Sequence, residues 1–224
     1  MPNKSKFRML CGLFCCPPTI TSIKNKITFT PPNPATYSIT INSEGTIDIK
    51  FSNGQFSSQI ALPGRKIEPY LISTTDDTMI ACLHFILFES PLYTILYSHG
   101  NASDLGHNHI LLMELGICLN CNVVSYDYSG YGLSTGVPSE QNIIKNIENV
   151  YNYMVKNLKI EKNKIILYGQ SLGSVPTINL ASKEEVAGVI LQSALASGLR
   201  LIFPNLITTP FFDVFNKYFI NSLK

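Results

Sequence analysis

A serine stands between two glycines in the segment Gly169-Gln170-Ser171-Leu172-Gly173, directly after the apolar run at residues 164–168. A strand, a sharp turn and a helix that carry Gly-x-Ser-x-Gly present a nucleophilic serine at the end of a sheet. The turn holds the serine in a strained backbone conformation, and the glycines avoid clashes with the strand before it and the helix after it. Ser171 is therefore predicted to be the nucleophile of an acyl-transfer reaction.

A serine alcohol becomes a useful nucleophile only when a base accepts its proton and fixed donors meet the oxyanion that forms. The backbone N–H of Leu172, at the start of the expected helix, would be one such donor. The segment Ser98-His99-Gly100-Asn101-Ala102 follows an expected strand. The N–H of Asn101 or Ala102 is the candidate for the second donor. This chemistry needs no metal ion and no organic cofactor.

The base is the part of this machinery that the sequence does not supply. In serine sites of this kind the chain order is serine, acid, histidine, and no histidine follows Ser171. His99 precedes the serine and is predicted to shape the donor loop. The remaining histidines are expected in an early strand and on an exposed helix, respectively His84 and the pair His107 and His109.

Carboxylates near these segments also have structural interpretations. Asp127 is predicted to fix its own loop by hydrogen bonds, while Glu184 and Glu185 are expected to be solvated at a helix end. The alternative for the serine motif itself is that Gly169 and Gly173 only permit close strand–helix packing, which would make the serine a turn residue.

Strands alternate with helices through most of the chain. Short apolar runs predict strands at residues 46–51, 80–88, 92–98, 122–126, 164–168 and 186–191. In the first of these, Ile47, Ile49 and Phe51 should share one face. A helix is expected over residues 104–118, and Ser139 is a good N-cap for another, whose apolar positions repeat at helical spacing: Ile143, Ile144, Ile147, Val150, Tyr151, Met154 and Leu158. The pattern predicts an α/β fold with a doubly wound, mostly parallel sheet.

Composition limits the class of protein. A chain of 224 residues that is 45% hydrophobic can bury a sizeable core, so one domain is expected. The formal net charge of +2 gives no reason to expect a nucleic-acid partner. No run of about 18 uncharged apolar residues predicts a transmembrane helix. Cys82, Cys118 and Cys121 are expected to be buried structural thiols, because the Cys-x-x-Cys pair has no second pair or histidines beside it.

Residues 1–40 are predicted to be a cysteine- and proline-rich membrane-anchoring segment and linker, followed at residues 41–224 by an incomplete α/β domain that carries the serine motif. The segment contains Cys11, Cys15, Cys16 and several prolines, without helical periodicity. Its basic residues favour an anionic cytoplasmic membrane surface, by about 1 kcal/mol each. A signal peptide is the weaker interpretation, since the apolar run is short and has no cleavage site.

Three ordered segments resemble a known family: LYSHGNA at residues 96–102, SYDYSGYG at 125–132 and YGQSLG at 168–173. Together they resemble the α/β-hydrolase domain-containing protein 17 family, which are membrane-anchored serine hydrolases that remove palmitate from protein cysteines. The resemblance implies an α/β-hydrolase fold and a palmitoyl-protein thioesterase with Ser171 as nucleophile. It also implies an anchor acylated at Cys11, Cys15 and Cys16. The substrates would be S-palmitoylated membrane proteins at the cytoplasmic face of the plasma membrane and of endosomal membranes.

The family pattern further implies a catalytic acid after another strand and a later histidine in a Gly-His context. Neither segment occurs here, and Asp213 does not stand at the acid's place in that pattern. The expected fold therefore lacks its last strands and helices, which truncation, alternative splicing or an incomplete gene model would explain most simply. The alternative is a catalytically incomplete, membrane-tethered protein that acts by binding.

Overall fold

The computed structural model describes residues 25–26, 28–41, 47–57, 64–74 and 76–195. The chain divides into two compact units, Met1–Thr30 and Pro31–Lys224, and the fold below is that of the second. Within the described ranges, every helix is too short or too polar to span a bilayer.

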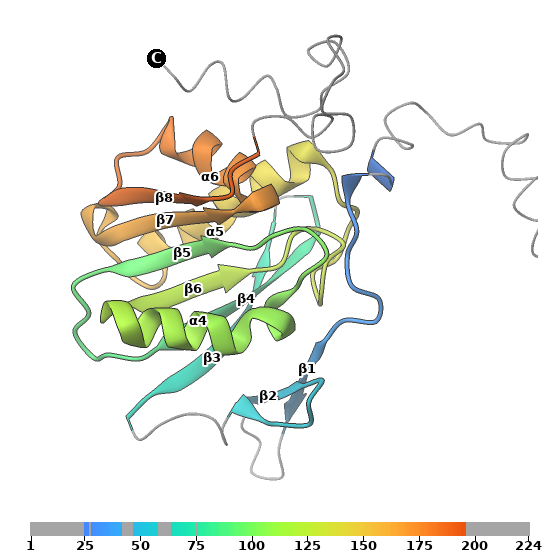
Figure 1. Ribbon diagram of the computed structural model, residues 1–224, viewed down its shortest axis with the longest axis horizontal. Coiled ribbons are helices and arrows are strands. Elements are labelled where there is room, and N and C mark those ends of the chain that lie inside the picture. Colours follow the sequence, from blue (N-terminus) through green and yellow to red (C-terminus); the bar gives the residue numbers. More distant parts are fainter. Residues whose placement is uncertain (1–24, 27, 42–46, 58–63, 75, 196–224) are drawn as a thin grey trace, which may run out of the picture. The chain divides into compact units, whose positions relative to one another are not determined.

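A six-stranded sheet forms the centre of this unit, with the strand order β3-β4-β6-β5-β7-β8 (Figure 1). The pairs β5–β6, β5–β7 and β7–β8 are parallel, whereas β4 is antiparallel to both β3 and β6. The strands are β3 (Lys66–Ser73), β4 (Met79–Ile86), β5 (Thr94–Ser98), β6 (Asn122–Tyr126), β7 (Ile165–Gln170) and β8 (Gly188–Gln192). A separate antiparallel pair consists of β1 (Tyr37–Ile41) and β2 (Ile47–Phe51).

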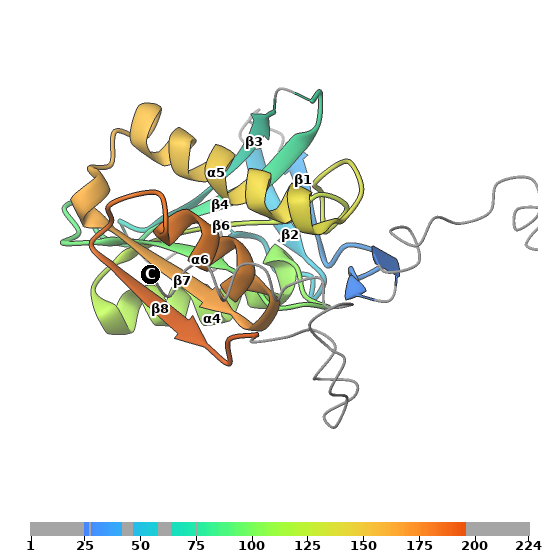
Figure 2. The same cartoon turned by 90° about the horizontal axis from the view of Figure 1, so that it is seen from above.

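Helices cover both faces of the sheet, with α4 (Leu105–Leu119) on one side and α5 (Glu140–Lys156) and α6 (Ser174–Ala181) on the other (Figure 2). Each long helix starts at a side chain that caps it. The Asp104 carboxylate accepts from the N–H of His107 at the start of α4, and the Ser139 hydroxyl accepts from the N–H of Asn142 at the start of α5. These caps fix where α4 and α5 begin after their preceding strands.

The core on the α4 side joins the sheet, the helix and the β1–β2 pair. It consists of buried side chains from all three: Tyr37, Ile49, Phe51, Ile67, Ala81, Leu83, Phe85, Leu87, Ile95, Tyr97, Leu105, Leu112, Cys121 and Val123. Burial of this apolar surface is the main favourable term that holds β1 and β2 against the larger sheet.

The α/β class and the mostly parallel sheet are as predicted, and the strand at residues 122–126 has the predicted bounds. Two early strands were missed. β1 crosses the boundary predicted after residue 40, so residues 37–40 belong to the fold. β3 contains Pro69, which argues against an interior strand, but β3 lies at the end of the strand order, where proline is tolerated.

The predicted face of the strand at residues 46–51 was wrong at its start. Ile47 is 60% exposed, whereas Asp48 is buried. The Asp48 carboxylate accepts from the Ser57 hydroxyl at 2.5 Å and from the N–H of Ile49 at 2.8 Å. These two donors offset the cost of removing the carboxylate from water, so the alternation does not hold at this position.

Candidate active site

Ser171 occupies the sharp turn between β7 and α6. Its φ angle is +50°, in the left-handed region that L-residues rarely adopt. The residue before it ends β7, and a 3₁₀ turn, η2 (Ser171–Gly173), leads directly into α6. Ser171 is half-buried, so its hydroxyl stands at the carboxyl edge of the parallel strands. This is the strand–turn–helix geometry that a nucleophilic serine requires.

The two flanking glycines are needed because backbone from other segments passes close to them. A Cβ on Gly173 would overlap the carbonyl group of Ser98 and lie 2.9 Å from the His99 carbonyl oxygen. A Cβ on Gly169 would lie 2.7 Å from the Gly173 carbonyl oxygen. Contacts this short are sterically excluded, so the glycines let the end of β5 and the start of α6 approach the serine turn.

The loop after β5 lies directly beside the serine turn. Ser98 pairs with Gly169 at the ends of β5 and β7, and a Cβ on Gly100 would lie 3.8 Å from Ser171 Cβ. The Tyr97 hydroxyl donates to Gln170 Oε1 at 2.8 Å. The structure therefore brings the predicted donor loop and the predicted nucleophile to one edge of the sheet.

The three candidate oxyanion donors differ in their surroundings. Leu172 is buried in the first turn of η2, where backbone N–H groups have no intrahelical acceptor. Ala102 has a φ of +54°, and its N–H donates to Asn101 Oδ1 at 3.1 Å. The same Asn101 oxygen accepts from the Tyr131 hydroxyl at 2.6 Å. Ala102 can therefore serve as a donor only by giving up this bond, whereas the side chain of Asn101 is held in place.

His99 is enclosed at the base of the donor loop. Its ring is fully buried, 4.2 Å from the ring of Tyr128 between centroids. Its Nδ1 donates to the Gly100 carbonyl at 2.8 Å, and its Nε2 lies 3.5 Å from Asp127 Oδ1. That second contact is within ion-pair distance but makes no hydrogen bond. Both ring nitrogens thus face partners other than Ser171, which supports the predicted structural role of His99.

Asp127 has the loop-fixing role predicted for it, and it acts over a longer range than its own loop. The carboxylate is fully buried and accepts from the Leu105 N–H at 3.0 Å and from the Tyr37 hydroxyl at 2.6 Å. Its own carbonyl accepts from the Ser134 hydroxyl at 2.8 Å. Burial and this carboxylate raise the pKa of the Tyr37 phenol well above its usual range, so Tyr37 is the donor.

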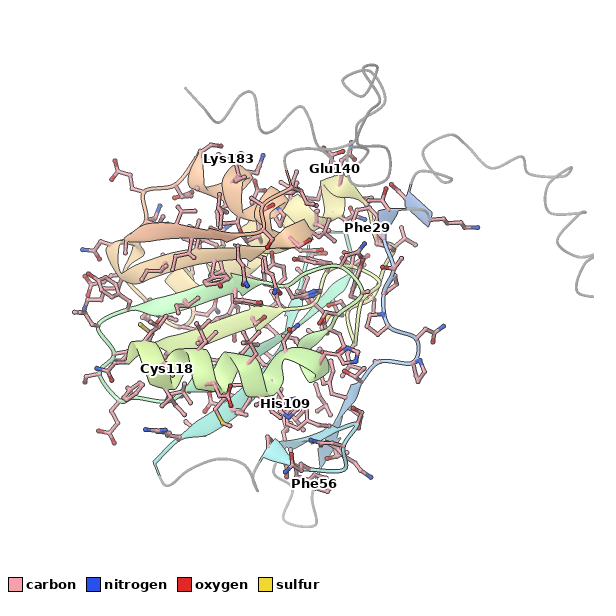
Figure 3. All side chains as sticks on the ribbon, in the orientation of Figure 1. Phe29, Phe56, His109, Cys118, Glu140 and Lys183 are labelled. Carbon is pink, nitrogen blue, oxygen red and sulfur yellow. The ribbon has the colours of Figure 1, made fainter. Side chains whose placement is uncertain are left out.

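Of the other histidines, only His107 is exposed as predicted. The prediction for His109, which is labelled on α4 in Figure 3, was wrong. Its ring is buried and stacks on Phe51 with a centroid separation of 3.8 Å. The β1–β2 pair thus covers a helix face that looks solvated when read in isolation. His84 lies in β4 as expected and is buried. Among the described residues, no histidine is hydrogen-bonded to Ser171.

The remaining predicted groups are partly outside the described residues. Glu184 is partly exposed and its carboxylate lies 2.6 Å from Lys162 Nζ, which agrees with a solvated role. Cys82 and Cys121 are buried thiols, but Cys118 is exposed, so its predicted burial was wrong (Figure 3). Residues beyond the described ranges include Asp213 and the proposed lipidation sites Cys11, Cys15 and Cys16. Nowhere in the described ranges do three His, Cys, Asp or Glu side chains gather as metal ligands would.

Sequence patterns did not predict that Thr36 and Tyr37, near the N-terminal end of the fold, contact residues beside this site. Thr36 donates through its N–H to Asp104 Oδ2 at 2.8 Å, and its hydroxyl bonds to the same carboxylate. Tyr37 reaches Asp127 as described above. The signal at Asp104 was readable, since aspartate before a helical pattern predicts an N-cap. Nothing local to Tyr37 indicates its partner, because the two residues are 90 positions apart.

Comparison with known proteins identifies relatives that are named alpha/beta hydrolase domain-containing proteins. No family model matches the chain. It is 42% identical over 214 residues to the alpha/beta hydrolase domain-containing protein aho-3 of Caenorhabditis elegans, covering 96% of this chain and 64% of that protein. It is 40% identical over 217 residues to the human alpha/beta hydrolase domain-containing protein 17B, covering 95% of this chain and 74% of that protein. The mouse protein 17C is 37% identical over 232 residues, which are 92% of this chain and 72% of that protein.

Solved structures agree on the fold. An α/β hydrolase from Vibrio vulnificus superposes with a TM-score of 0.58 at 16% identity, covering 70% of this chain and 60% of that one. An esterase from Pyrococcus furiosus superposes with a TM-score of 0.57 at 19% identity, covering 72% and 67%. With the serine turn, the donor loop and this extent of identity together, the chain belongs to the α/β-hydrolase domain-containing protein 17 family.

Proposed function

We propose that this protein is a serine hydrolase that removes palmitate from S-acylated cysteines of membrane-associated proteins, with Ser171 as the nucleophile. The observation that carries the proposal is the backbone of Ser171, which has a φ of +50° between β7 and η2, beside the loop that follows β5. The strain of such a turn persists only where the surrounding structure fixes it, and such strain clusters at active sites. The family's α/β-hydrolase names support hydrolysis, and the motif resemblance suggests the palmitoyl thioester.

The reaction follows from the position of the serine. Ser171 Oγ attacks the thioester carbonyl, and its proton passes to a base that must come from outside the described residues, since no histidine among them is hydrogen-bonded to Ser171. The Leu172 N–H and a donor from Asn101 or Ala102 meet the negative oxygen. The carbon–sulfur bond then breaks, and the cysteine leaves as a thiol after it receives that proton. Water next attacks the acyl-serine, releases palmitate and restores the serine.

The N-terminal segment supplies the proposed membrane attachment. S-acylation of Cys11, Cys15 and Cys16, together with nearby basic residues, would hold the protein at the cytoplasmic face of the plasma membrane and endosomal membranes. One acyl chain gives only marginal binding, and several give stable anchoring. Replacement of all three cysteines by serine should move the protein to the soluble fraction. Unchanged membrane association would place the anchor elsewhere.

A fluorophosphonate probe tests the nucleophile. Where a base is supplied, the protein should be labelled and should hydrolyse a palmitoyl-thioester peptide, and Ser171→Ala should abolish both. The 224 residues, which have no histidine after Ser171, should hydrolyse the peptide only slowly. The Ser171→Ala substitution removes one side-chain atom of a half-buried residue, so a circular dichroism spectrum and melting temperature like those of the wild type would confirm that the fold is intact. Equal labelling of the variant would overturn the assignment of Ser171. Acyl-chain binding without labelling or hydrolysis in the wild type would favour the binding-only alternative.

A further inference from the structure

Thr36, directly before β1, and Tyr37, the first residue of β1, are hydrogen-bonded to the carboxylates of Asp104 and Asp127. Tyr37 is 5% exposed, and its hydroxyl donates to Asp127 Oδ2 at 2.6 Å. Asp127 itself is fully buried. A hydrogen bond to an ionised group in a dry environment is among the stronger ones in proteins. The phenol of Tyr37 therefore constrains the position of this carboxylate.

Asp127 in turn contacts the donor loop through His99 and the start of α4 through Leu105. Its Oδ1 accepts from the Leu105 N–H at 3.0 Å and lies 3.5 Å from His99 Nε2. The carboxylate also has little room to move, because even a Cβ on Gly132 would overlap Asp127 Oδ2. A shift of Asp127 must consequently displace the first residue of α4, the ring of His99, or both.

His99 is the next link toward the nucleophile. Its Nδ1 donates to the Gly100 carbonyl at 2.8 Å, and its own carbonyl accepts from the Tyr128 hydroxyl at 2.5 Å. Gly100 abuts the serine turn, since a Cβ there would lie 3.6 Å from Gln170 Oε1 and 3.8 Å from Ser171 Cβ. Tyr37, Asp127, His99 and Gly100 thus form a series of neighbouring groups that leads to the serine turn, with two hydrogen bonds and one 3.5 Å contact between them.

Thr36 makes a second tie one residue earlier. Its N–H donates to Asp104 Oδ2 at 2.8 Å, and Asp104 caps α4 directly after the donor loop. Gly106 allows this approach, because a Cβ on it would lie 2.7 Å from the carbonyl carbon and oxygen of Thr36. The backbone at Thr36 and Tyr37 therefore lies on the first turn of α4.

We propose that Tyr37 is a positioning residue for the serine site, acting through Asp127 and His99 to hold the donor loop at residues 99–102 against Ser171. The inference rests on the proposed function, because the loop matters only if its N–H groups meet an oxyanion at Ser171. Without the phenol hydroxyl, Asp127 Oδ2 loses a donor, and because the carboxylate is closely packed, even a small shift of it changes its contacts with Leu105 and His99. Small misplacements of catalytic groups slow reactions by roughly ten- to a hundredfold.

The test is the kinetics of fluorophosphonate labelling at Ser171 in Tyr37→Phe, which keeps the ring and removes only the hydroxyl. We expect the labelling rate constant to fall roughly tenfold while the final labelled fraction stays at the wild-type value. A loss caused only by irreversible unfolding would lower the final labelled fraction and leave the rate constant of the folded protein unchanged. That result, or an unchanged rate constant and fraction, would overturn the proposal.

The matched control is Tyr70→Phe. The Tyr70 hydroxyl also bonds to a carboxylate, that of Glu68, but both residues lie in β3 at the end of the strand order. This variant should be labelled at the wild-type rate. An equal slowing in both variants would show that loss of any carboxylate-bonded tyrosine hydroxyl slows labelling, and would overturn a specific role for Tyr37.

Hydrogen exchange separates this inference from the proposed function. In Tyr37→Phe the amides of residues 99–105 should exchange at least several-fold faster than in the wild type, and those of β8 should not change. This holds whether or not Ser171 reacts with the probe. Absence of wild-type labelling together with faster loop exchange would refute the hydrolase proposal and support the positioning role. Unchanged loop exchange would refute the positioning role alone.

Discussion

The serine turn and the donor loop lie side by side, but different forces hold them. The turn at residues 169–173 depends on steric exclusion: two glycines admit the backbone of β5 and α6, and the φ of +50° at Ser171 follows from this fit. The donor loop at residues 99–102 and the start of α4 depend on buried polar contacts from β1 and from the segment after β6. The serine turn is thus fixed by close backbone contacts, including one from β5. The donor loop is fixed by side-chain hydrogen bonds from distant parts of the chain.

This difference predicts different tolerances. The turn should reject any added atom, while the loop should tolerate changes of size better than the loss of a hydrogen-bond partner. Buried donors and acceptors without partners cost about 1–3 kcal/mol each. Substitutions should therefore destabilise the serine turn by steric clash and the donor loop by loss of hydrogen-bond partners.

The largest effect is expected at Gly173. In Gly173→Ala the new Cβ overlaps the Ser98 carbonyl, and both groups are backbone-bound, so neither can rotate away. We expect the free energy of unfolding to fall by roughly 3–5 kcal/mol, measured by urea denaturation. Gly188→Ala in β8 is the control, because a Cβ there meets nothing within 4 Å. Similar losses in both variants would contradict the steric account of the turn.

A smaller effect is expected from Asp127→Ala. It leaves the Leu105 N–H and the Tyr37 hydroxyl without an acceptor in a dry site, which should lower the free energy of unfolding by about 2–3 kcal/mol. Asp76→Ala removes a carboxylate that pairs with Lys145 at 2.7 Å on the surface, where it is 57% exposed. That change should cost less than about 1 kcal/mol. If the two variants were equally stable, polar support of the loop would not explain its position.

The smallest effect is expected from acid, which should lower the free energy of unfolding through His84, a residue outside the serine turn and the donor loop. Burial lowers the pKa of His84 from 6.5 to about 4, so the unfolded chain binds this proton more tightly than the folded protein does. The stability that the neutral ring provides is complete above about pH 6.5 and is lost as the pH falls toward about 4. From about pH 7 to about pH 5 the free energy of unfolding should fall by on the order of 1.5 kcal/mol.

His84→Leu should remove most of that pH dependence in urea denaturation curves recorded at both pH values. A fall as large as in the wild type would assign the acid sensitivity to other groups. Since His84 lies in β4 and outside both regions, labelling rates for the turn and the loop are best compared above about pH 6.5, where this ring does not affect the folded population.

The amino-acid sequence alone determined the features that depend on neighbours along the chain. Gly169, Ser171 and Gly173 specify the turn through the backbone strain at Ser171, which is set within a few residues, although the contact that requires glycine at position 173 comes from Ser98 in β5. Asp104 and Ser139 mark the starts of α4 and α5 through bonds to residues three positions away. The β6 strand was equally readable, since Val123, Val124 and Tyr126 are residue types that favour strands, and all five of its residues are buried.

Only the tertiary structure decided which distant groups meet at the site. His109 lies beneath Phe51 although its helix position looks solvated, and Tyr37 joins the site from a segment that resembles a linker. Hydrophobic patterning records that a residue is buried but carries no information on its partner. The bond from Tyr37 to Asp127 spans 90 residues, and it forms because β1 packs on the α4 side of the core, which brings the phenol to a fully buried carboxylate.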